Sequence, residues 1–270
     1  SSAASDVYKR QDRDNSIIRK EDILSLSQSY SNNSVNGMDL LDDMIGMEQI
    51  KHSVEEIIAH IKFSRRIPNI SYPCIHMRCV GSPGTGKTTV ARIIGKILKE
   101  NGVLRNGNFF EYSGRDFCGR YVGETAPKTA EMCRDAYGSV LFIDEAYSLY
   151  RNENNTNDFG QEALDTLISE MENHRDDFVV IMAGYTDEMN ELMKGNNGLA
   201  SRMPYVIEFP NYTREQLCQI YFKMLGNSFE YDEDFQSAVT EYFNSISDET
   251  LSAKDFSNAR FCLLYTSDAA

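Results

Sequence analysis

The sequence lacks long apolar runs and is short of basic residues. It holds 27 lysines and arginines against 41 aspartates and glutamates, so the formal net charge is −14 (27 − 41) over 270 residues. We find no stretch that predicts a transmembrane helix. Binding to a phosphate backbone calls for a basic stripe, so the balance of charge disfavours nucleic acid as the default partner. The net charge is still compatible with a local basic face on the folded protein.

Cysteine usage argues against two further classes. Six cysteines are present, with neither a CxxC pair nor a zinc-like array among them, so we predict neither a metal-bound nor a disulfide framework. Reduced thiols of this kind suit a cytoplasmic protein. The four histidines are scattered, and we expect structural roles for them: His52, His60, His76 and His174. With 41% hydrophobic and 25% charged residues, the chain is long enough for one large domain or a large and a small one.

Both ends of the chain have an unusual composition. Residues 1–11 and 262–270 resemble the two strands of one sequencing adaptor in translation, so we expect neither to be protein structure. The authentic fragment is then 12–261, with both natural termini missing. Residues 12–39 are rich in serine, asparagine and aspartate, which predicts a polar linker. Because the adaptor would replace the natural continuation, we expect the segment after about residue 250 to be held loosely.

A phosphate-binding loop is the most specific motif. The run from Gly81 to Thr88 fits G-x-x-x-x-G-K-[ST] at every fixed position and lies between an apolar segment and a helical one. Its glycines let backbone N–H groups turn toward phosphates, Lys87 can reach the β- and γ-phosphates, and Thr88 can hold Mg²⁺. A bare match can also be a glycine-rich turn. The predicted nucleotide-binding residues here are Pro83, Gly84, Thr85, Gly86, Lys87, Thr88 and Thr89.

A second motif supports the nucleotide site. Residues 139–145 form a short apolar run that ends in two acids, which predicts a buried parallel strand. Asp144 would orient the Mg²⁺ shell, and Glu145 would polarise the water that attacks the γ-phosphate. This arrangement favours ATP hydrolysis over kinase chemistry, since a kinase must keep water out. The alternative is a core strand with a solvated acidic end.

The apolar pattern predicts an α/β domain followed by helices. Strands alternate with helices up to Pro210, which implies a parallel sheet covered on both faces, and the strand signals then stop. The predicted strands are 76–81, 108–113, 139–144, 178–184 and 205–209, and the predicted helices are 47–63, 87–100, 126–137, 159–173, 213–226 and 232–246. We therefore divide the chain into a nucleotide-binding domain at 40–210 and an incomplete helical lid domain at 211–261.

This layout resembles that of AAA+ ATPases, and further segments resemble their CbxX/CfxQ type. That type includes red-type Rubisco activase, the stage V sporulation ATPase and the ATPase domain of type VII secretion systems. The resemblance covers about residues 40–261 and rests on the segments 119–129, 141–147, 158–163 and 171–177. It implies a P-loop core with a small helical lid, ATP and Mg²⁺ as ligands, a hexameric homo-oligomeric ring and a protein client. In the segment 41–47, it implies that Ile45 and Gly46 border the adenine.

The resemblance also implies roles outside the phosphate loop. Tyr121, Val122 and Gly123 match a pore loop that grips a polypeptide, and a surface turn is the alternative. Arg202 matches the arginine finger that reaches the γ-phosphate of the neighbouring subunit, and an ordinary salt bridge is the alternative. Arg260 matches the sensor-2 arginine, which contacts the nucleotide of its own subunit; a solvated surface arginine is its alternative.

The residue that positions the attacking water is not settled by the sequence. Many AAA relatives carry asparagine after the fourth strand, but this chain reads Ala183-Gly184-Tyr185-Thr186, so Tyr185 and Thr186 are both candidates. We interpret the chain as an ATP-hydrolysing ring motor that remodels a protein client through a central pore. The alternative is a nucleotide-dependent assembly switch or scaffold that threads nothing.

Overall fold

A computed structural model describes residues 35–64, 74–150, 159–226, 231–254 and 256–267, with side chains up to Leu263. The predicted adaptor segment 1–11 and most of the predicted linker 12–39 lie outside the described residues.

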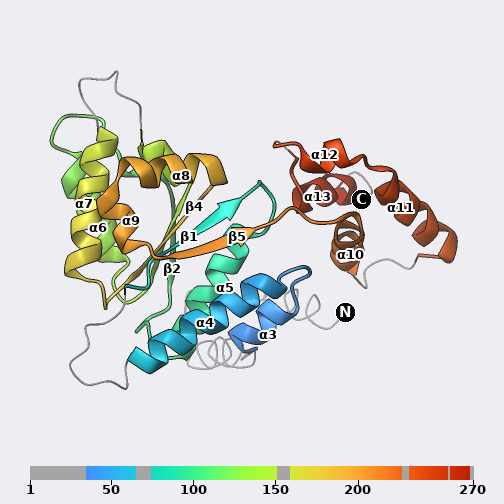
Figure 1. The fold of residues 1–270 in the computed structure, drawn as a ribbon, viewed down its shortest axis with the longest axis horizontal. Helices are drawn as coiled ribbons and strands as arrows, with labels where there is room; N and C mark the ends of the chain where they lie inside the picture. Colours follow the sequence, from blue (N-terminus) through green and yellow to red (C-terminus); the bar gives the residue numbers. More distant parts are fainter. Residues whose placement is uncertain (1–34, 65–73, 151–158, 227–230, 255, 268–270) are drawn as a thin grey trace, which may run out of the picture. The chain divides into compact units, whose positions relative to one another are not determined.

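Five parallel strands form a single sheet in the order β2-β3-β4-β1-β5 (Figure 1). Each strand is five or six residues long and is close to the range that the apolar pattern predicts. The strands are β1 (Met77–Gly81), β2 (Phe109–Ser113), β3 (Val140–Asp144), β4 (Val179–Gly184) and β5 (Tyr205–Phe209). Because all neighbours are parallel, β1, β3 and β4 end at the same edge of the sheet, where ligands of open α/β sheets bind.

Helices cover both faces of the sheet, as Figure 1 shows. Neighbouring residues of β3 enter different hydrophobic clusters, Phe142 on one face and Leu141 and Ile143 on the other, because side chains alternate along a strand. The first face holds α4 (Glu48–Ser64) and α5 (Lys87–Glu100); the second holds α6 (Thr125–Asp135), α7 (Phe159–Asn173), α8 (Thr186–Gly195), α9 (Asn197–Arg202) and the short 3₁₀ helices η1 (Gly114–Phe117) and η2 (Ala146–Leu149). The predicted α/β fold class is confirmed.

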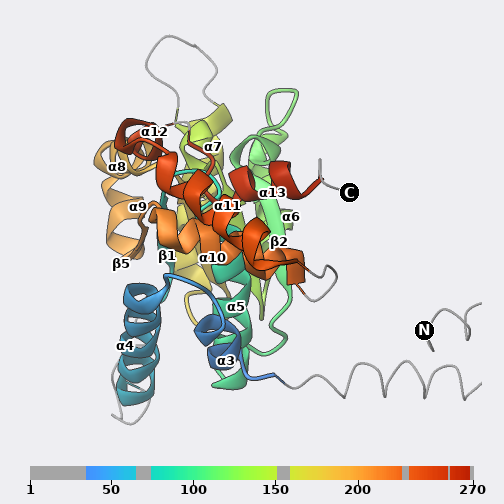
Figure 2. The same ribbon diagram turned by 90° about the vertical axis from the view of Figure 1, so that its right-hand side faces the viewer.

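Among the described residues, four helices follow the sheet, and we refer to them together as the lid (Figure 2). Local capping defines where they begin: Thr213 and Gln216 make a reciprocal capping box at α10, and the side chains of Asp232 and Ser247 each accept a backbone N–H at the starts of α11 and α12. The lid helices are α10 (Arg214–Leu225), α11 (Glu233–Ser245), α12 (Asp248–Ser252) and α13 (Ala259–Ser267). Among the described residues, no helix has the length and apolar character needed to cross a membrane.

The structure differs from the sequence prediction near both ends of the described chain. Residues Gly37–Asp42, partly assigned to the linker, form helix α3, because Leu41 is fully buried and the Gly37 N–H donates to the Glu100 carboxylate at 2.9 Å. At the other end, α13 continues to Ser267, into the predicted adaptor segment. Cys262 is fully buried there and its thiol donates to the Leu217 carbonyl at 3.5 Å. In the structure this end is packed against α10, since a small apolar side chain falls on the inner face of α13; the loose attachment and the adaptor origin both stay predictions.

His76 is a buried structural histidine beside β1. Its Nδ1 accepts the Val180 N–H at 3.0 Å, and its Nε2 lies 3.4 Å from the Met171 carbonyl oxygen. Burial lowers its pKa from 6.5 to about 4. Protonation of Nδ1 would place two donors against each other, so the folded protein holds the neutral ring.

We expect this histidine to make the fold sensitive to mild acid. Since the folded pKa lies below the unfolded one, the contribution of His76 is fully present above pH 6.5 and is lost as the pH falls toward 4. At pH 5 the loss is about 2 kcal/mol of unfolding free energy. Urea unfolding of the parent and of His76→Gln at pH 7.5 and 5 tests this prediction. The variant should be less stable at pH 7.5 but lose less on acidification; the exposed His52→Gln control should follow the parent, and equal losses in all three would contradict the prediction.

Candidate functional site

The loop between β1 and α5 has the backbone of an anion cradle. Gly84 and Gly86 have φ of 70° and 94°, in the left-handed region that glycine tolerates. The Thr85 hydroxyl donates to the Ser82 carbonyl at 2.8 Å and closes the turn. Gly86 then caps α5, so the helix points its N-terminus and its unpaired N–H groups at the loop.

Lys87 folds back over this loop. Its Nζ donates to the carbonyls of Gly81 at 2.9 Å and Ser82 at 2.8 Å. Burial lowers the pKa of Lys87 from 10.5, while the negative charge of Asp144 acts in the opposite direction. The ammonium group is thus held by two carbonyls that a phosphate could replace as its partner.

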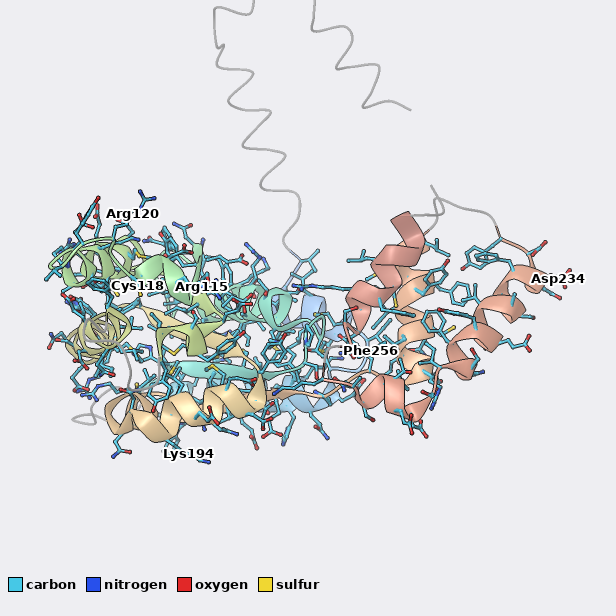
Figure 3. All side chains as sticks on the ribbon, turned by 90° about the horizontal axis from the view of Figure 1, so that it is seen from above. Arg115, Cys118, Arg120, Lys194, Asp234 and Phe256 are labelled. Carbon is cyan, nitrogen blue, oxygen red and sulfur yellow. The ribbon has the colours of Figure 1, made fainter. Side chains whose placement is uncertain are left out.

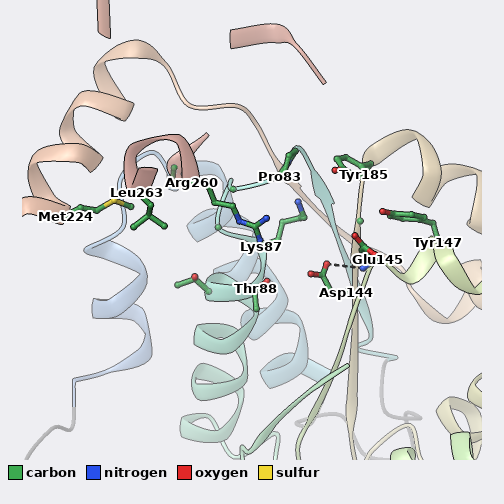
Figure 4. Close-up of a pocket in the computed structure, with 15 residues that line it drawn as sticks. Pro83, Lys87, Thr88, Asp144, Glu145, Tyr147, Tyr185, Met224, Arg260 and Leu263 are labelled. Atoms are coloured by element: carbon green, nitrogen blue, oxygen red, sulfur yellow. Dashed lines mark hydrogen bonds between the residues drawn. The ribbon is translucent and has the colours of Figure 1, made fainter. Parts of the chain in front are cut away.

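The two acids at the end of β3 differ in backbone conformation. Asp144 ends the strand, and its Oδ1 accepts the N–H of Glu145 at 3.0 Å (Figure 4). Glu145 has φ 49° and ψ 42°, a left-handed conformation that is uncommon for a residue with a side chain. This turn leaves the Glu145 side chain exposed while Asp144 stays partly buried. Strain of this kind often marks a functional residue.

These groups meet in one cavity of about 320 Å³ at the carboxyl edge of the sheet (Figure 4). Nine of the predicted site residues line it: Pro83, Gly84, Gly86, Lys87, Thr88, Thr89, Asp144, Glu145 and Arg260. They come from the phosphate loop, the first turn of α5, the end of β3 and the start of α13. The cavity therefore brings two cations and two acids together around a loop built for anions.

Two tyrosines in the lining come from the α/β domain. Tyr185 follows β4 and Tyr147 lies in η2; their ring centroids are 5.9 Å apart. Burial and the nearby Glu145 raise the pKa of Tyr147 to about 12, so its hydroxyl stays protonated and can donate. The Tyr147 ring packs closely against Gly184 at the end of β4, where a Cβ would lie 2.8 Å from the ring. Of the two candidates for positioning water, Tyr185 lines the cavity, whereas Thr186 starts α8 and is not in the lining.

The lid supplies the remaining wall. Arg260 is in the first turn of α13, and Ala259, Leu263 and Met224 line the cavity beside it. Sequence reasoning missed Tyr147, Met224 and Leu263. Of these three, only Tyr147 carried a signal, its position two residues after Glu145; the other two reach the cavity through tertiary packing of the lid.

Arg202 lies elsewhere, at the end of α9, and does not line the cavity. Its Nη1 donates to the Gly198 carbonyl at 2.8 Å, and its Nε lies 3.0 Å from the Glu172 carboxylate. The Glu172 carboxylate also pairs with Arg175. The structure therefore holds the guanidinium of Arg202 in an ion pair away from the cavity described above.

The predicted pore loop is a solvent-exposed turn between η1 and α6. Tyr121 is 71% and Val122 78% exposed. Gly123 has φ 86°, and a Cβ on this residue would meet no atom within 4 Å. The Glu124 carboxylate shapes the turn by accepting the N–H groups of Arg120 at 3.1 Å and Tyr121 at 3.2 Å. Figure 3 shows Arg115, Cys118 and Arg120 together at one end of the α/β domain.

Ile45 and Gly46 do not line the cavity. Gly46 has φ 72°, and a Cβ there would lie 2.7 Å from the side-chain amide of Gln216 in α10. Ile45 packs partly buried against the hydrophobic cluster that joins α4, α5 and the lid. A role at the adenine ring stays a prediction for both residues.

Comparison with known proteins agrees with this arrangement. The family model described as "ATPase family associated with various cellular activities (AAA)" matches residues 77–211. The chain is 41% identical to protein CfxQ of Xanthobacter flavus over 209 residues, covering 76% of this chain and 66% of that protein. It is 40% identical to stage V sporulation protein K of Bacillus subtilis, covering 81% and 68%.

Two further matches extend the comparison. The chain is 40% identical to the chloroplastic ribulose bisphosphate carboxylase/oxygenase activase of Cyanidioschyzon merolae, covering 82% of this chain and 76% of that protein. Among solved structures, the FIGL-1 AAA domain in complex with ADP matches with a TM-score of 0.58 at 20% identity, covering 93% of this chain and 80% of that one. The likeness to the FIGL-1 domain concerns the fold alone.

Proposed function

Because the chain belongs to the AAA family of ATPases and, within it, to the CbxX/CfxQ type, we propose that it hydrolyses ATP at subunit interfaces of a ring and uses the energy to remodel a protein client. The observation that carries the proposal is the convergence of Lys87, Asp144, Glu145 and Arg260 on one cavity. The chain matches 66% of the length of CfxQ, so the client-directed activity is proposed for the protein that contains this segment.

The cavity fits a nucleoside triphosphate. The left-handed glycines Gly84 and Gly86 line the cavity, and so do two cations, Lys87 and Arg260. Backbone N–H groups at the start of α5 would hold the phosphates, while Lys87 and Arg260 would bind their charge. Met224 of the lid offers apolar surface to a base.

The same wall fits Mg²⁺. Thr88 offers a hydroxyl and Asp144 a carboxylate, hard oxygen donors that this ion prefers alongside phosphate oxygens. When bound, the ion would neutralise charge on the phosphates. The Asp144 carboxylate also accepts the Glu145 N–H. Asp144, which would hold the metal, therefore fixes the backbone turn at Glu145, which would take a proton from water.

The position of Arg202 supports a homo-oligomer. Its guanidinium lies outside the cavity of its own chain, but an arginine finger acts on the γ-phosphate and is often supplied in trans. In a closed ring, one repeated interface would place each Arg202 at the next subunit's cavity. We propose a homo-oligomeric ring of six subunits, the assembly that the resemblance to AAA+ ATPases implies.

Tyr121 and Val122 are the surface that we propose grips the client. Both are largely exposed apolar side chains on a turn held by Glu124, and such exposure without a structural purpose suggests contact with a partner. Repeated around a ring, these loops would line a central pore and transmit force to an unfolded segment.

We expect Tyr121→Ala to uncouple ATP hydrolysis from work on a polypeptide. Basal turnover should change less than about twofold, since the loop is outside the cavity, while stimulation by a permanently unfolded model polypeptide should be lost. Tyr121→Phe keeps the aromatic side chain, so this variant should still be stimulated by the polypeptide. The readout is ATP turnover against polypeptide concentration. If Tyr121→Ala is stimulated like the parent, threading is wrong and an assembly switch of the same ATPase is favoured.

A further inference from the structure

Asn258 is a fully buried polar residue at the junction of the lid and the phosphate loop. It lies just before α13 and has φ 48°, one of two left-handed residues other than glycine among the described residues, the second being Glu145. Asparagine tolerates this conformation better than most residues. A buried amide in an unusual conformation calls for a physical reason.

Its side chain joins three separate segments. Nδ2 lies 3.2 Å from each of three oxygens, the Pro83 carbonyl in the phosphate loop, the Asn211 side-chain carbonyl and the Phe256 carbonyl. Oδ1 accepts the N–H of Tyr212 at 3.1 Å. Both the donor and the acceptor of the amide are therefore used, and only a carboxamide of this length supplies both.

Neighbouring groups continue the same contact. The N–H of Ala259 donates to the Gly84 carbonyl at 3.1 Å, and the Tyr212 hydroxyl donates to the Thr85 carbonyl at 3.3 Å. Together with Asn258, these bonds engage three consecutive carbonyls of the phosphate loop, at Pro83, Gly84 and Thr85. The approach is so close that a Cβ on Gly84 would lie 1.9 Å from the Ser257 carbonyl oxygen.

Arg260 follows Asn258 by two residues, in the first turn of α13, and lines the cavity. The side chain of Asn258 therefore fixes the start of that helix relative to the loop that would hold the phosphates. A shift of the loop would move the start of α13 through the Pro83 and Gly84 carbonyls, and a shift of the lid would move Arg260.

We propose that Asn258 is the positioning residue that sets Arg260 over the phosphates and couples occupancy of the phosphate loop to the lid; this rests on the proposed function, since it needs ATP in this cavity. The residue acts through Arg260 and not by touching the nucleotide. Its effect on nucleotide affinity should accordingly depend on the presence of the arginine.

The test is a double-mutant cycle on the 270-residue chain. Asn258→Asp is nearly isosteric and keeps an acceptor for the Tyr212 N–H, but it loses the amide donor and brings an oxygen against the Pro83 carbonyl. We expect it to weaken ATP binding about tenfold in the parent and less than about twofold in an Arg260→Ala background, because interacting residues are not additive. The measurement is the ATP dissociation constant of all four proteins.

Two more variants complete the experiment. Asn258→Gly keeps the left-handed backbone, removes every side-chain bond and should show the same dependence on Arg260, so it decides the matter if the aspartate variant does not fold. Asn173→Asp, an exposed change of the same type on α7, should bind ATP like the parent. Parent-like affinity of both Asn258 variants, or equal losses with and without Arg260, would overturn the inference alone. A parent that does not bind ATP would overturn the proposed function and this inference with it.

Discussion

Glu145→Gln should reduce ATP turnover by a factor of about 10² to 10⁴, the usual contribution of a positioned general base. The amide has nearly the same shape as the carboxylate but cannot accept a proton from water. The left-handed turn and the bond from the Glu145 N–H to the Asp144 carboxylate do not involve the Glu145 side chain, so the change leaves them in place. Affinity for ATP should therefore stay within about twofold of the parent, because the phosphate cradle is intact.

Steady-state turnover and equilibrium ATP binding, measured on the same preparation, check this result. Glu191→Gln is the matched control: it is an exposed glutamate on α8, outside the cavity lining, and should turn over like the parent. Parent-like turnover of Glu145→Gln would show that a different group activates water, and the assignment of Glu145 would be wrong.

Arg202→Ala should have the second large effect, a loss of about 10³ to 10⁵ in turnover if the residue acts as an arginine finger. Since its guanidinium does not line its own cavity, affinity for ATP in an isolated subunit should not change. The fold should tolerate the change, because Glu172 keeps Arg175 as a partner and no unpaired charge is left behind.

Arg175→Ala is the control for this prediction. It removes the other guanidinium from the same Glu172 carboxylate, so a purely structural role of the ion pairs predicts similar losses for both variants. We expect turnover of Arg175→Ala to stay within about threefold of the parent, as is usual for a partly exposed ion pair. Equal effects of the two changes would contradict the finger assignment.

The strands and the phosphate loop could be predicted because local sequence determines them. Short apolar runs that end in glycine or acids indicate parallel strands, and the predicted ranges of β5 and α7 agree with the structure to the residue. The apolar pattern did not lead us to predict helices α8 and α9, because polar residues and glycines are frequent in this part of the sequence. Met189, Leu192 and Met193 are all buried in α8, and their spacing in the sequence has the period of a helix, so this helix did carry a local signal.

The site could be predicted in part for the same reason. The cradle and the two acids are motifs, so they were found, whereas Met224 and Leu263 reach the cavity only because the lid folds over it. Asn258 carried no recognisable sequence signal beyond its place beside Arg260. Its role depends on contacts with Pro83 and Asn211, which lie 175 and 47 residues away in the chain, and no local pattern encodes such contacts.

We propose that one subunit's phosphate loop and the next subunit's Arg202 make a single ATPase site. The most direct measurement mixes two inactive proteins, Arg202→Ala and Lys87→Ala, and follows ATP turnover against total concentration. We expect the mixture to regain activity that neither protein has alone, and we expect this activity to rise with concentration, because an intact cavity pairs with an intact finger. A mixture as inactive as its components, beside a parent whose turnover per subunit is independent of concentration, would contradict it.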